Sequence, residues 1–231
     1  LGEVCTAPCE RGCHRAAHDR ALAIRDLHRR AGQEAVERTL TAEPSTGKRI
    51  AIVGAGPAGL AAAHVLLRLR HACTLYDKAD HAGRMLLEYA EGQLDPRTLE
   101  TEVGIIRKMG VALILGHEVG VDSTLEQLRR DHDALVVACD GFEPTDEGVF
   151  PAVEYPMAVS AVAEGKAAAG QVDRYLRGLP AVRRPRPFNS RLGTVKADEL
   201  DAFLTRRDPA ATSKHDLLKA LLDAAYGAPE D

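Results

Sequence analysis

Three glycines directly after an apolar run form the clearest chemical motif in this chain of 231 residues. The apolar run over residues 49–53 leads into Gly54, Gly56 and Gly59 with the spacing G-x-G-x-x-G, and an alanine-rich segment follows. A strand that turns through such glycines into a helix suits a dinucleotide. The glycines allow a tight turn, close approach of the backbone to a pyrophosphate, and packing of helix on sheet. The helix N-terminus adds unpaired N–H groups and a positive dipole end.

An acidic residue follows at the distance that ribose binding requires. Residues 72–76 are predicted to form a second strand, which ends at Asp77. Asp77 comes 23 residues after Gly54, close to the spacing of about 20 that is typical of a ribose-binding carboxylate. A glycine-rich turn without any ligand is the competing interpretation, and the strand–turn–helix–strand context disfavours it.

Three cysteines near the start of the chain have a spacing that could hold an inorganic centre. Cys5, Cys9 and Cys13 form C-x3-C-x3-C, and Pro8 and Gly12 supply the turns between them. Thiolates are preferred ligands of iron–sulfur clusters and also bind zinc, so both centres are open at this point.

The fourth ligand of such a centre must be a different kind of residue or must come from another chain. The histidines nearby are His14, His18 and His28. His14 directly follows Cys13, which makes convergence on the same centre awkward. His28 lies on a helix predicted over residues 21–28 and could reach back, although an exposed helical histidine is the competing interpretation.

Composition excludes several classes of function. The net charge of −4 provides no bulk attraction to nucleic acid or to an anionic membrane. No apolar run approaches the roughly 20 residues that span a bilayer. The polar N-terminus predicts no signal peptide, so the cytoplasm is the expected compartment. An odd count of five cysteines argues against a disulfide framework, and Cys73 and Cys139 are predicted to be buried small hydrophobic residues.

The cysteine and glycine motifs, in this order, resemble the flavoprotein family of the glutamate synthase small subunit and the N-terminal half of dihydropyrimidine dehydrogenase. The chain matches that family's V-C-x-A-P-C-E-x-x-C at residues 4–13 and its V-G-A-G-P-A-G-L at residues 53–60. The likeness continues through residues 75–78, 82–85, 94–97, 110–111, 118–120 and 124–128. The resemblance implies FAD as the nucleotide and a 4Fe–4S cluster on the three cysteines, with His28 at the position of the fourth ligand.

The resemblance also implies a wider set of FAD-binding residues, some of which depart from the family's pattern. The set is Gly54, Gly56, Pro57, Ala58, Gly59, Asp77, Lys78, Gly83, Arg84, Met85, Val119, Ala138, Glu154 and Ala158. Relatives carry Gly-Asp in the returning strand, where this chain has Val153-Glu154, so Glu154 would stand in with a longer side chain. The paired glycines near the flavin are reduced to Ala82-Gly83. A degenerate flavin fold that binds no FAD is the alternative.

A second nucleotide domain that the family carries is missing from this sequence. Relatives end the strand over residues 134–138 with Ala-Thr-Gly and then insert an NAD(P)H-binding domain, whereas this chain continues with Cys139-Asp140-Gly141. Residues 148–150 already resemble the returning strand, so the domain is deleted near residues 141–148. A domain of that kind needs about 140 residues. We therefore expect that this chain does not bind NAD(P)H.

The predicted architecture is α/β. It has a Rossmann-like FAD-binding domain with a parallel sheet, a small helical iron–sulfur segment before it, and a helical C-terminal tail after it. The domain boundaries are residues 1–46, 47–178 and 179–231. Strands are expected near residues 49–53, 72–76, 111–115 and 134–138, with helices near 57–70, 96–109 and 124–131. The family resemblance implies a further helix over residues 160–176, which closes the FAD domain. The tail is expected to hold an extended arm over residues 183–191, a helix over 197–204, and another between Ser213 and Gly227.

The function predicted from these features is electron transfer within a larger oxidoreductase. FAD and a 4Fe–4S cluster would relay electrons to a redox partner, with other subunits of a multi-subunit oxidoreductase as partners and with no catalytic side chain required. Two alternatives remain open. One is a compact NAD(P)H-dependent reductase whose nicotinamide site is unrecognised or formed at a dimer interface. The other is a structural or assembly subunit with a vestigial FAD fold.

Overall fold

The chain divides into two units, residues 1–182 and 183–231. The computed structural model describes residues 2–17, 19–34, 45–90, 94–142, 147–152 and 157–181. The predicted arm and C-terminal helices lie outside the described residues, as do Glu154 and His18. The three-part domain division of the sequence analysis therefore stays a prediction.

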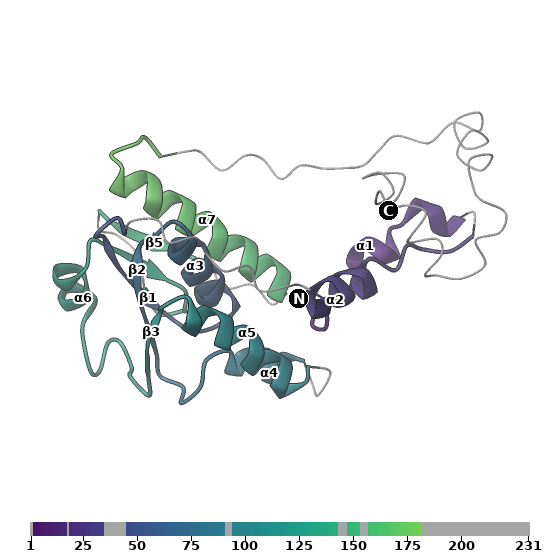
Figure 1. Cartoon of the computed structure of the whole chain (residues 1–231), viewed down its shortest axis with the longest axis horizontal. Helices are drawn as coiled ribbons and strands as arrows, with labels where there is room; N and C mark the ends of the chain where they lie inside the picture. Colours follow the sequence, from purple (N-terminus) through teal and green to yellow (C-terminus); the bar gives the residue numbers. More distant parts are fainter. Residues whose placement is uncertain are drawn as a thin grey trace, which may run out of the picture. The chain divides into compact units, whose positions relative to one another are not determined.

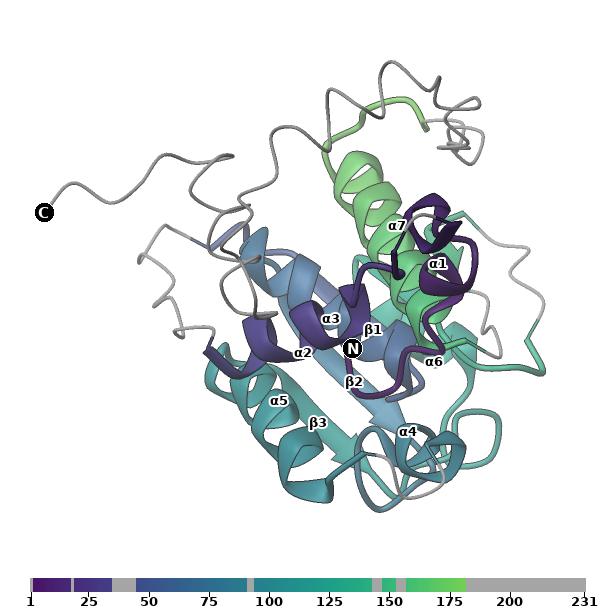
Figure 2. The same cartoon turned by 90° about the vertical axis from the view of Figure 1, so that its right-hand side faces the viewer.

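A parallel sheet of five strands forms the centre of the first unit. The strands are β1 (Arg49–Val53), β2 (Ala72–Asp77), β3 (Ala112–Leu115), β4 (Ala134–Val137) and β5 (Val149–Pro151), in the order β3-β2-β1-β4-β5. Each neighbouring pair is parallel, and Figure 2 shows β3, β2 and β1 side by side. The order reverses between β1 and β4, so a crevice opens there at the carboxyl ends of the strands. The predicted α/β fold class is confirmed.

Helices cover the two faces of this sheet unequally. The first face carries α3 (Pro57–Arg68), α5 (Pro96–Lys108) and α7 (Ala158–Leu176), the second carries α6 (Leu125–Asp131), and the short helix α4 (Arg84–Tyr89) follows β2. Figure 1 shows α6 on the side of the sheet opposite to α3 and α7. The helices and strands predicted within the described residues are present with ends shifted by a few residues, whereas α4 was not predicted. None of the helices in the described ranges is long and apolar enough to cross a bilayer.

Strand β1 shows why both faces must be covered. Ile50 and Ile52 pack beneath α3 and α7, while Ala51 and Val53 belong to the smaller cluster beneath α6. All four side chains are buried. Since successive side chains of a strand point to opposite faces, the continuous apolar run in the sequence reflects burial on both sides.

Two glycines allow the first helix to sit where the nucleotide motif requires it. A Cβ atom on Gly59 would lie 1.8 Å from the Gly54 carbonyl oxygen, and one on Gly165 would lie 2.0 Å from the Ala58 carbonyl oxygen. Helix α3 therefore approaches the turn after β1 through Gly59 and contacts α7 through Gly165. Neither contact has room for a side chain, so both glycines help to fix the start of α3.

The cysteine-bearing segment forms small helices of its own. It contains α1 (Pro8–Arg11), a 3₁₀ helix (His14–Ala17) and α2 (Ile24–Glu34). The predicted helix over residues 21–28 thus begins later and is longer. The Glu10 carboxylate accepts a hydrogen bond from the Arg25 backbone N–H at 2.7 Å. The Arg25 guanidinium donates to the carbonyl oxygens of Gly2 and Glu3, so α2 holds the loop that carries the cysteines.

Candidate functional site

A cleft of about 610 Å³ opens at the carboxyl ends of β1, β2, β3 and β4. We call it the carboxyl-edge cleft; its walls include Gly54–Gly56 after β1, Asp77–Ala79 after β2, His117–Val119 after β3 and Ala138–Asp140 after β4. Because every wall begins where a parallel strand ends, the cleft lies at the point where an open α/β sheet binds its ligands.

The glycine loop brings backbone N–H groups to this cleft. Gly54 has a φ of 105°, which favours glycine, and a Cβ atom there would lie 2.4 Å from the Ala138 carbonyl oxygen. Gly56 is the N-cap of α3 and Pro57 follows at the first helical position, and no side chain caps this end of the helix. The first N–H groups of a helix have no partner within the helix. An anionic group at this end would find donors and a favourable dipole.

Asp77 ties the two neighbouring strand ends together. One oxygen of its carboxylate accepts a hydrogen bond from the Ala55 N–H and the other accepts from the Ala79 N–H at 2.7 Å. The carboxylate is therefore held at the floor of the cleft beside the glycine loop. An ionised carboxylate has further lone pairs with which it can accept hydrogen bonds from sugar hydroxyls.

Ring-bearing side chains line the cleft beside the polar loop. The rings of Tyr76 and His117 have their centroids 5.4 Å apart, and the His117 Nε2 atom lies 2.8 Å from the Ser123 hydroxyl oxygen. Burial raises the pKa of Tyr76 above its ordinary value. Phe142 also lines the cleft. The cleft thus offers both N–H donors and flat apolar surfaces.

The structure brings eight of the predicted FAD-binding residues to the carboxyl-edge cleft. They are Gly54, Gly56, Asp77, Lys78, Arg84, Met85, Val119 and Ala138. Pro57, Ala58 and Gly59 form the first turn of α3, Gly83 precedes α4, and Ala158 begins α7; none of these five is part of the lining. The role of each residue toward FAD stays a prediction.

Sequence reasoning missed part of the lining. His81, His117, Glu118, Cys139, Asp140 and Phe142 line the cleft as well. A usable signal was present, because residues that directly follow parallel strands collect at one edge of the sheet. Cys139 also corrects a prediction. Burial is confirmed for Cys73, where it raises the thiol pKa to about 12, but Cys139 is only half-buried because it lies at this open edge.

The three N-terminal cysteines are free thiols that the described structure does not gather around one point. Cys9 is exposed, while Cys5 and Cys13 are half-buried. Across the described ranges, no three His, Cys, Asp or Glu side chains lie close enough together to hold a metal ion. The Ala7 N–H donates to Cys5 Sγ at 3.4 Å. Hydrogen bonds from backbone N–H groups, the Leu22 N–H above all, lower the pKa of the Cys13 thiol. His28 is exposed.

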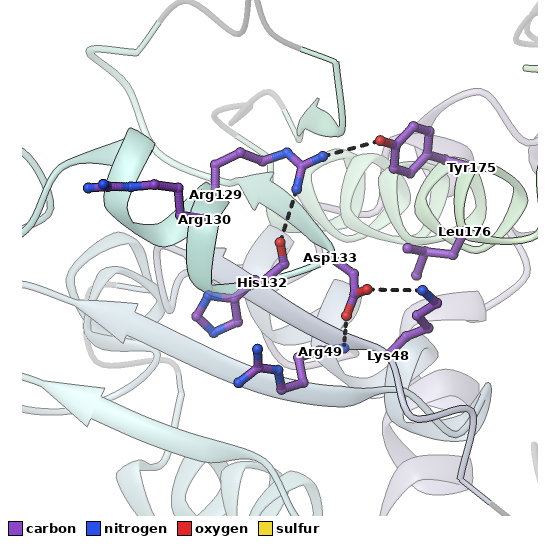
Figure 3. A pocket seen from close by; sticks show the side chains of 8 residues that line it. All are labelled: Lys48, Arg49, Arg129, Arg130, His132, Asp133, Tyr175 and Leu176. Atoms are coloured by element: carbon purple, nitrogen blue, oxygen red, sulfur yellow. Dashed lines mark hydrogen bonds and ion pairs between the residues drawn. The ribbon is translucent and has the colours of Figure 1, made fainter.

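A second hollow, of about 510 Å³, lies at the opposite edge of the sheet and is lined by Lys48, Arg49, Arg129, Arg130, His132, Asp133, Tyr175 and Leu176. We call it the amino-edge hollow (Figure 3). Its central Arg129 donates to the Glu147 carbonyl oxygen at 3.1 Å, to the His132 carbonyl oxygen at 3.0 Å and to the Tyr175 hydroxyl at 3.2 Å. Asp133 accepts from Lys48 Nζ at 3.0 Å and from the Arg49 N–H at 2.8 Å.

These contacts give the amino-edge hollow a structural role. Arg129 joins α6, the start of β4, the residues before β5, and α7. Arg129 and Arg130 also occupy the last turn of α6, where cations offset the negative end of the helix dipole. The side chains of Arg129, Asp133 and Lys48 thus have hydrogen-bond partners within the hollow, whereas the N-terminal N–H groups of α3 at the cleft have no side-chain cap.

Comparison with known proteins identifies the class of this fold. Residues 52–111 match the family model of the NAD(P)-binding Rossmann-like domain. This range contains the glycine loop, α3 and Asp77, so it covers the polar wall of the carboxyl-edge cleft.

Particular relatives are redox subunits. The chain is 34% identical over 145 residues to the glutamate synthase (NADPH) small chain of Bacillus subtilis, covering 61% of this chain and 29% of that protein. It is 36% identical over 166 residues to the NADP(+)-dependent formate dehydrogenase subunit beta of Moorella thermoacetica, covering 60% and 23%. It is 35% identical over 144 residues to the NADPH-Fe(3+) oxidoreductase subunit beta of Geobacter sulfurreducens, covering 59% and 21%. The resemblance inferred from the motifs is confirmed, and the chain spans less than a third of the length of these relatives.

Proposed function

We propose that this chain is an FAD- and 4Fe–4S-containing electron-transfer subunit of a larger oxidoreductase complex. The observation that carries the proposal is the carboxyl-edge cleft, where the glycine loop, the uncapped N-terminus of α3 and Asp77 meet. The names of the relatives, which are small or beta chains of oxidoreductases, support a partner-dependent role.

The residues of the cleft fit the ADP half of FAD. The Gly54 and Ala55 N–H groups already donate to the Tyr76 carbonyl oxygen and the Asp77 carboxylate. The pyrophosphate would therefore accept hydrogen bonds from the N–H groups at the uncapped start of α3. Asp77 would accept hydrogen bonds from the adenosine ribose, and Val119 and the neighbouring rings would enclose the base. Lys78 and Arg84 add positive charge to the lining, to which Glu88, Glu118 and Asp140 also contribute negative charge.

The chain's own residues would bind, orient and shield the cofactor rather than react with it. FAD can exchange two electrons with a hydride donor or one electron at a time with an iron–sulfur centre. Around it, the half-buried Met85 and the buried Ala138 would limit access of water to one side of the cleft. No proton transfer by a side chain is required.

The N-terminal cysteines fit an iron–sulfur cluster by the chemistry of their donors. Three thiols lie within nine residues of sequence, and Cys5 and Cys13 accept hydrogen bonds from backbone N–H groups. Such bonds stabilise thiolate ligands and tune a cluster's reduction potential. Since the described residues do not gather three ligands, we propose that the loop closes around the cluster or that another chain completes the ligand set, with His28 as this chain's candidate.

The short connection between β4 and β5 supports the proposed relay role. Only residues 138–148 join these neighbouring parallel strands, and parallel strands usually need a connection of a dozen residues or more. A nicotinamide-binding domain does not fit in that length. Electrons would therefore enter or leave through partner subunits, and NAD(P)H would bind elsewhere in the complex.

Purification without oxygen tests the proposal. The visible spectrum of the full chain should show flavin and iron–sulfur absorbance, with about one FAD and about four irons and sulfides per chain. Zinc without flavin would overturn the redox proposal and favour the scaffold alternative.

Addition of NADH or NADPH to the same sample separates the relay from the compact reductase. The relay predicts that the flavin absorbance stays unbleached until a partner subunit is added. Rapid bleaching of the isolated chain would contradict it.

A further inference from the structure

Phe142 occupies a position that neither the glycine motif nor the family resemblance assigns. It lies in the short segment that leaves β4 and returns to β5, where the family's second nucleotide domain is missing. Its side chain is half-buried and lines the carboxyl-edge cleft. The residue therefore belongs to the cleft only because this chain closes the β4–β5 connection as it does.

Neighbouring residues support the aromatic ring of Phe142. The ring packs against the apolar cluster that contains Val119 and Tyr76. Gly120 has a φ of 103°, and a Cβ atom there would lie 3.6 Å from the end of the Phe142 ring. Contact with these buried side chains holds the ring in place, and a ring held in this way can stack on a flat ligand.

The position of Phe142 along the cleft matches the base rather than the phosphates. The donors for a pyrophosphate lie at the glycine loop, and Asp77 lies beside that loop. His117, Val119 and Phe142 supply the ring-bearing and apolar part of the lining. A nucleotide whose phosphates meet the loop and whose ribose meets Asp77 would direct its base toward this part.

We infer that Phe142 is the residue that selects a purine base in the carboxyl-edge cleft, by stacking on the adenine ring of the bound dinucleotide. This inference rests on the proposed function, because it takes the cleft as a nucleotide site. It adds a specificity-determining residue from the connection that replaces the missing domain.

Binding of ADP and UDP to the full chain, freed of flavin, tests the inference by isothermal titration calorimetry. The two ligands share ribose and diphosphate and differ only in the base, so their affinity ratio reports the base contact alone. We expect the wild-type chain to bind ADP roughly tenfold more tightly than UDP, and Phe142→Leu to reduce that ratio to about two, given the usual strength of aromatic–base stacking. Phe142→Trp should keep the preference for ADP.

A matched control separates stacking from packing. Phe150 packs against Tyr175 with ring centroids 5.5 Å apart and is not part of the cleft lining. Phe150→Leu should lower the melting temperature and leave the ADP/UDP ratio unchanged.

The outcomes distinguish the inference from the function it rests on. An unchanged ADP/UDP ratio in Phe142→Leu, with wild-type binding intact, would overturn the role of Phe142 alone. A wild-type chain that binds neither ADP nor FAD would overturn both. Equal loss of ADP and UDP affinity in Phe142→Leu would also contradict base selection, because it would indicate a general collapse of the cleft.

Discussion

The carboxyl and amino edges of the sheet differ in the kinds of residue that they carry. At the carboxyl edge, the loop after β1 contains glycines, which have no side chain, and no side chain caps the N-terminus of α3. At the amino edge, Arg129 and Asp133 satisfy backbone and side-chain groups of four elements (Figure 3). The larger number of Lys and Arg side chains thus lies at the edge that holds the fold together. An accumulation of arginines around a hollow is therefore a poor guide to the binding site in this fold.

The largest effect is expected from adding a side chain to the glycine loop. In Gly59→Ala the new Cβ would meet the Gly54 carbonyl oxygen, so α3 must shift. We expect the free energy of unfolding to fall by roughly 3 kcal/mol, with loss of bound FAD, as measured by urea denaturation and flavin release. Gly104→Ala on α5 is the control, since nothing lies within 4 Å of its Cβ position, and it should be neutral or slightly stabilising. Retention of FAD at full stability in Gly59→Ala would refute the proposed packing.

The next effect should appear at the amino edge and only in stability. Arg129→Met keeps the aliphatic stem but loses three hydrogen bonds, so we expect a loss of about 2–3 kcal/mol in the free energy of unfolding. FAD affinity should stay unchanged. Arg130→Met, which removes an exposed neighbour, should change stability by less than about 0.5 kcal/mol. A loss of FAD affinity in Arg129→Met without a loss of stability would indicate that FAD binds at the amino edge, which would contradict our account.

Replacement of one aspartate by asparagine at each edge tests whether the two edges have separate roles. Asp77→Asn removes the negative charge of the carboxylate that would accept hydrogen bonds from the ribose hydroxyls. FAD affinity should therefore fall about tenfold, which is the loss expected for one charge-assisted hydrogen bond. Asp133→Asn should leave FAD affinity intact and lower the free energy of unfolding by about 1 kcal/mol. Fluorescence titration with FAD and urea denaturation of both variants would measure this. Asp77→Asn should also lower stability, because its carboxylate accepts hydrogen bonds from the Ala55 and Ala79 N–H groups. A loss of FAD affinity in Asp133→Asn would show that the two edges do not have separate roles.

The smallest effect concerns pH. The Arg49 backbone N–H, and after it Lys48, hold the pKa of Asp133 below its ordinary value of 3.8. A carboxyl whose folded pKa is depressed contributes stability above its unfolded pKa and loses that contribution as the pH falls through the folded pKa. The stability difference between the wild-type chain and Asp133→Asn should therefore be constant near neutrality and shrink below about pH 4, as followed by denaturation at several pH values. A stability difference that stayed constant below about pH 4 would contradict a stabilising role of the ionised Asp133 carboxylate.

Sequence patterns predicted the fold well because its determinants are local. The apolar runs of β1 and β4, the glycine spacing and the acid after β2 all act within a few residues of one another. Phe142 and Arg129 could not be placed in this way. Phe142 reaches the cleft through the β4–β5 connection, and Arg129 contacts groups as distant in sequence as Tyr175. The cysteines mark a different limit, since their spacing predicts a ligand set but the described loop does not bring three ligands together.

Hydrogen–deuterium exchange of the full chain with and without FAD tests the central claim most directly. Our account predicts that FAD slows exchange at residues 54–60, 77–85, 117–120 and 138–142, and leaves residues 48–49 and 129–133 unchanged. Protection at the amino edge, or no protection of the glycine loop, would contradict a dinucleotide site at the carboxyl edge of the sheet.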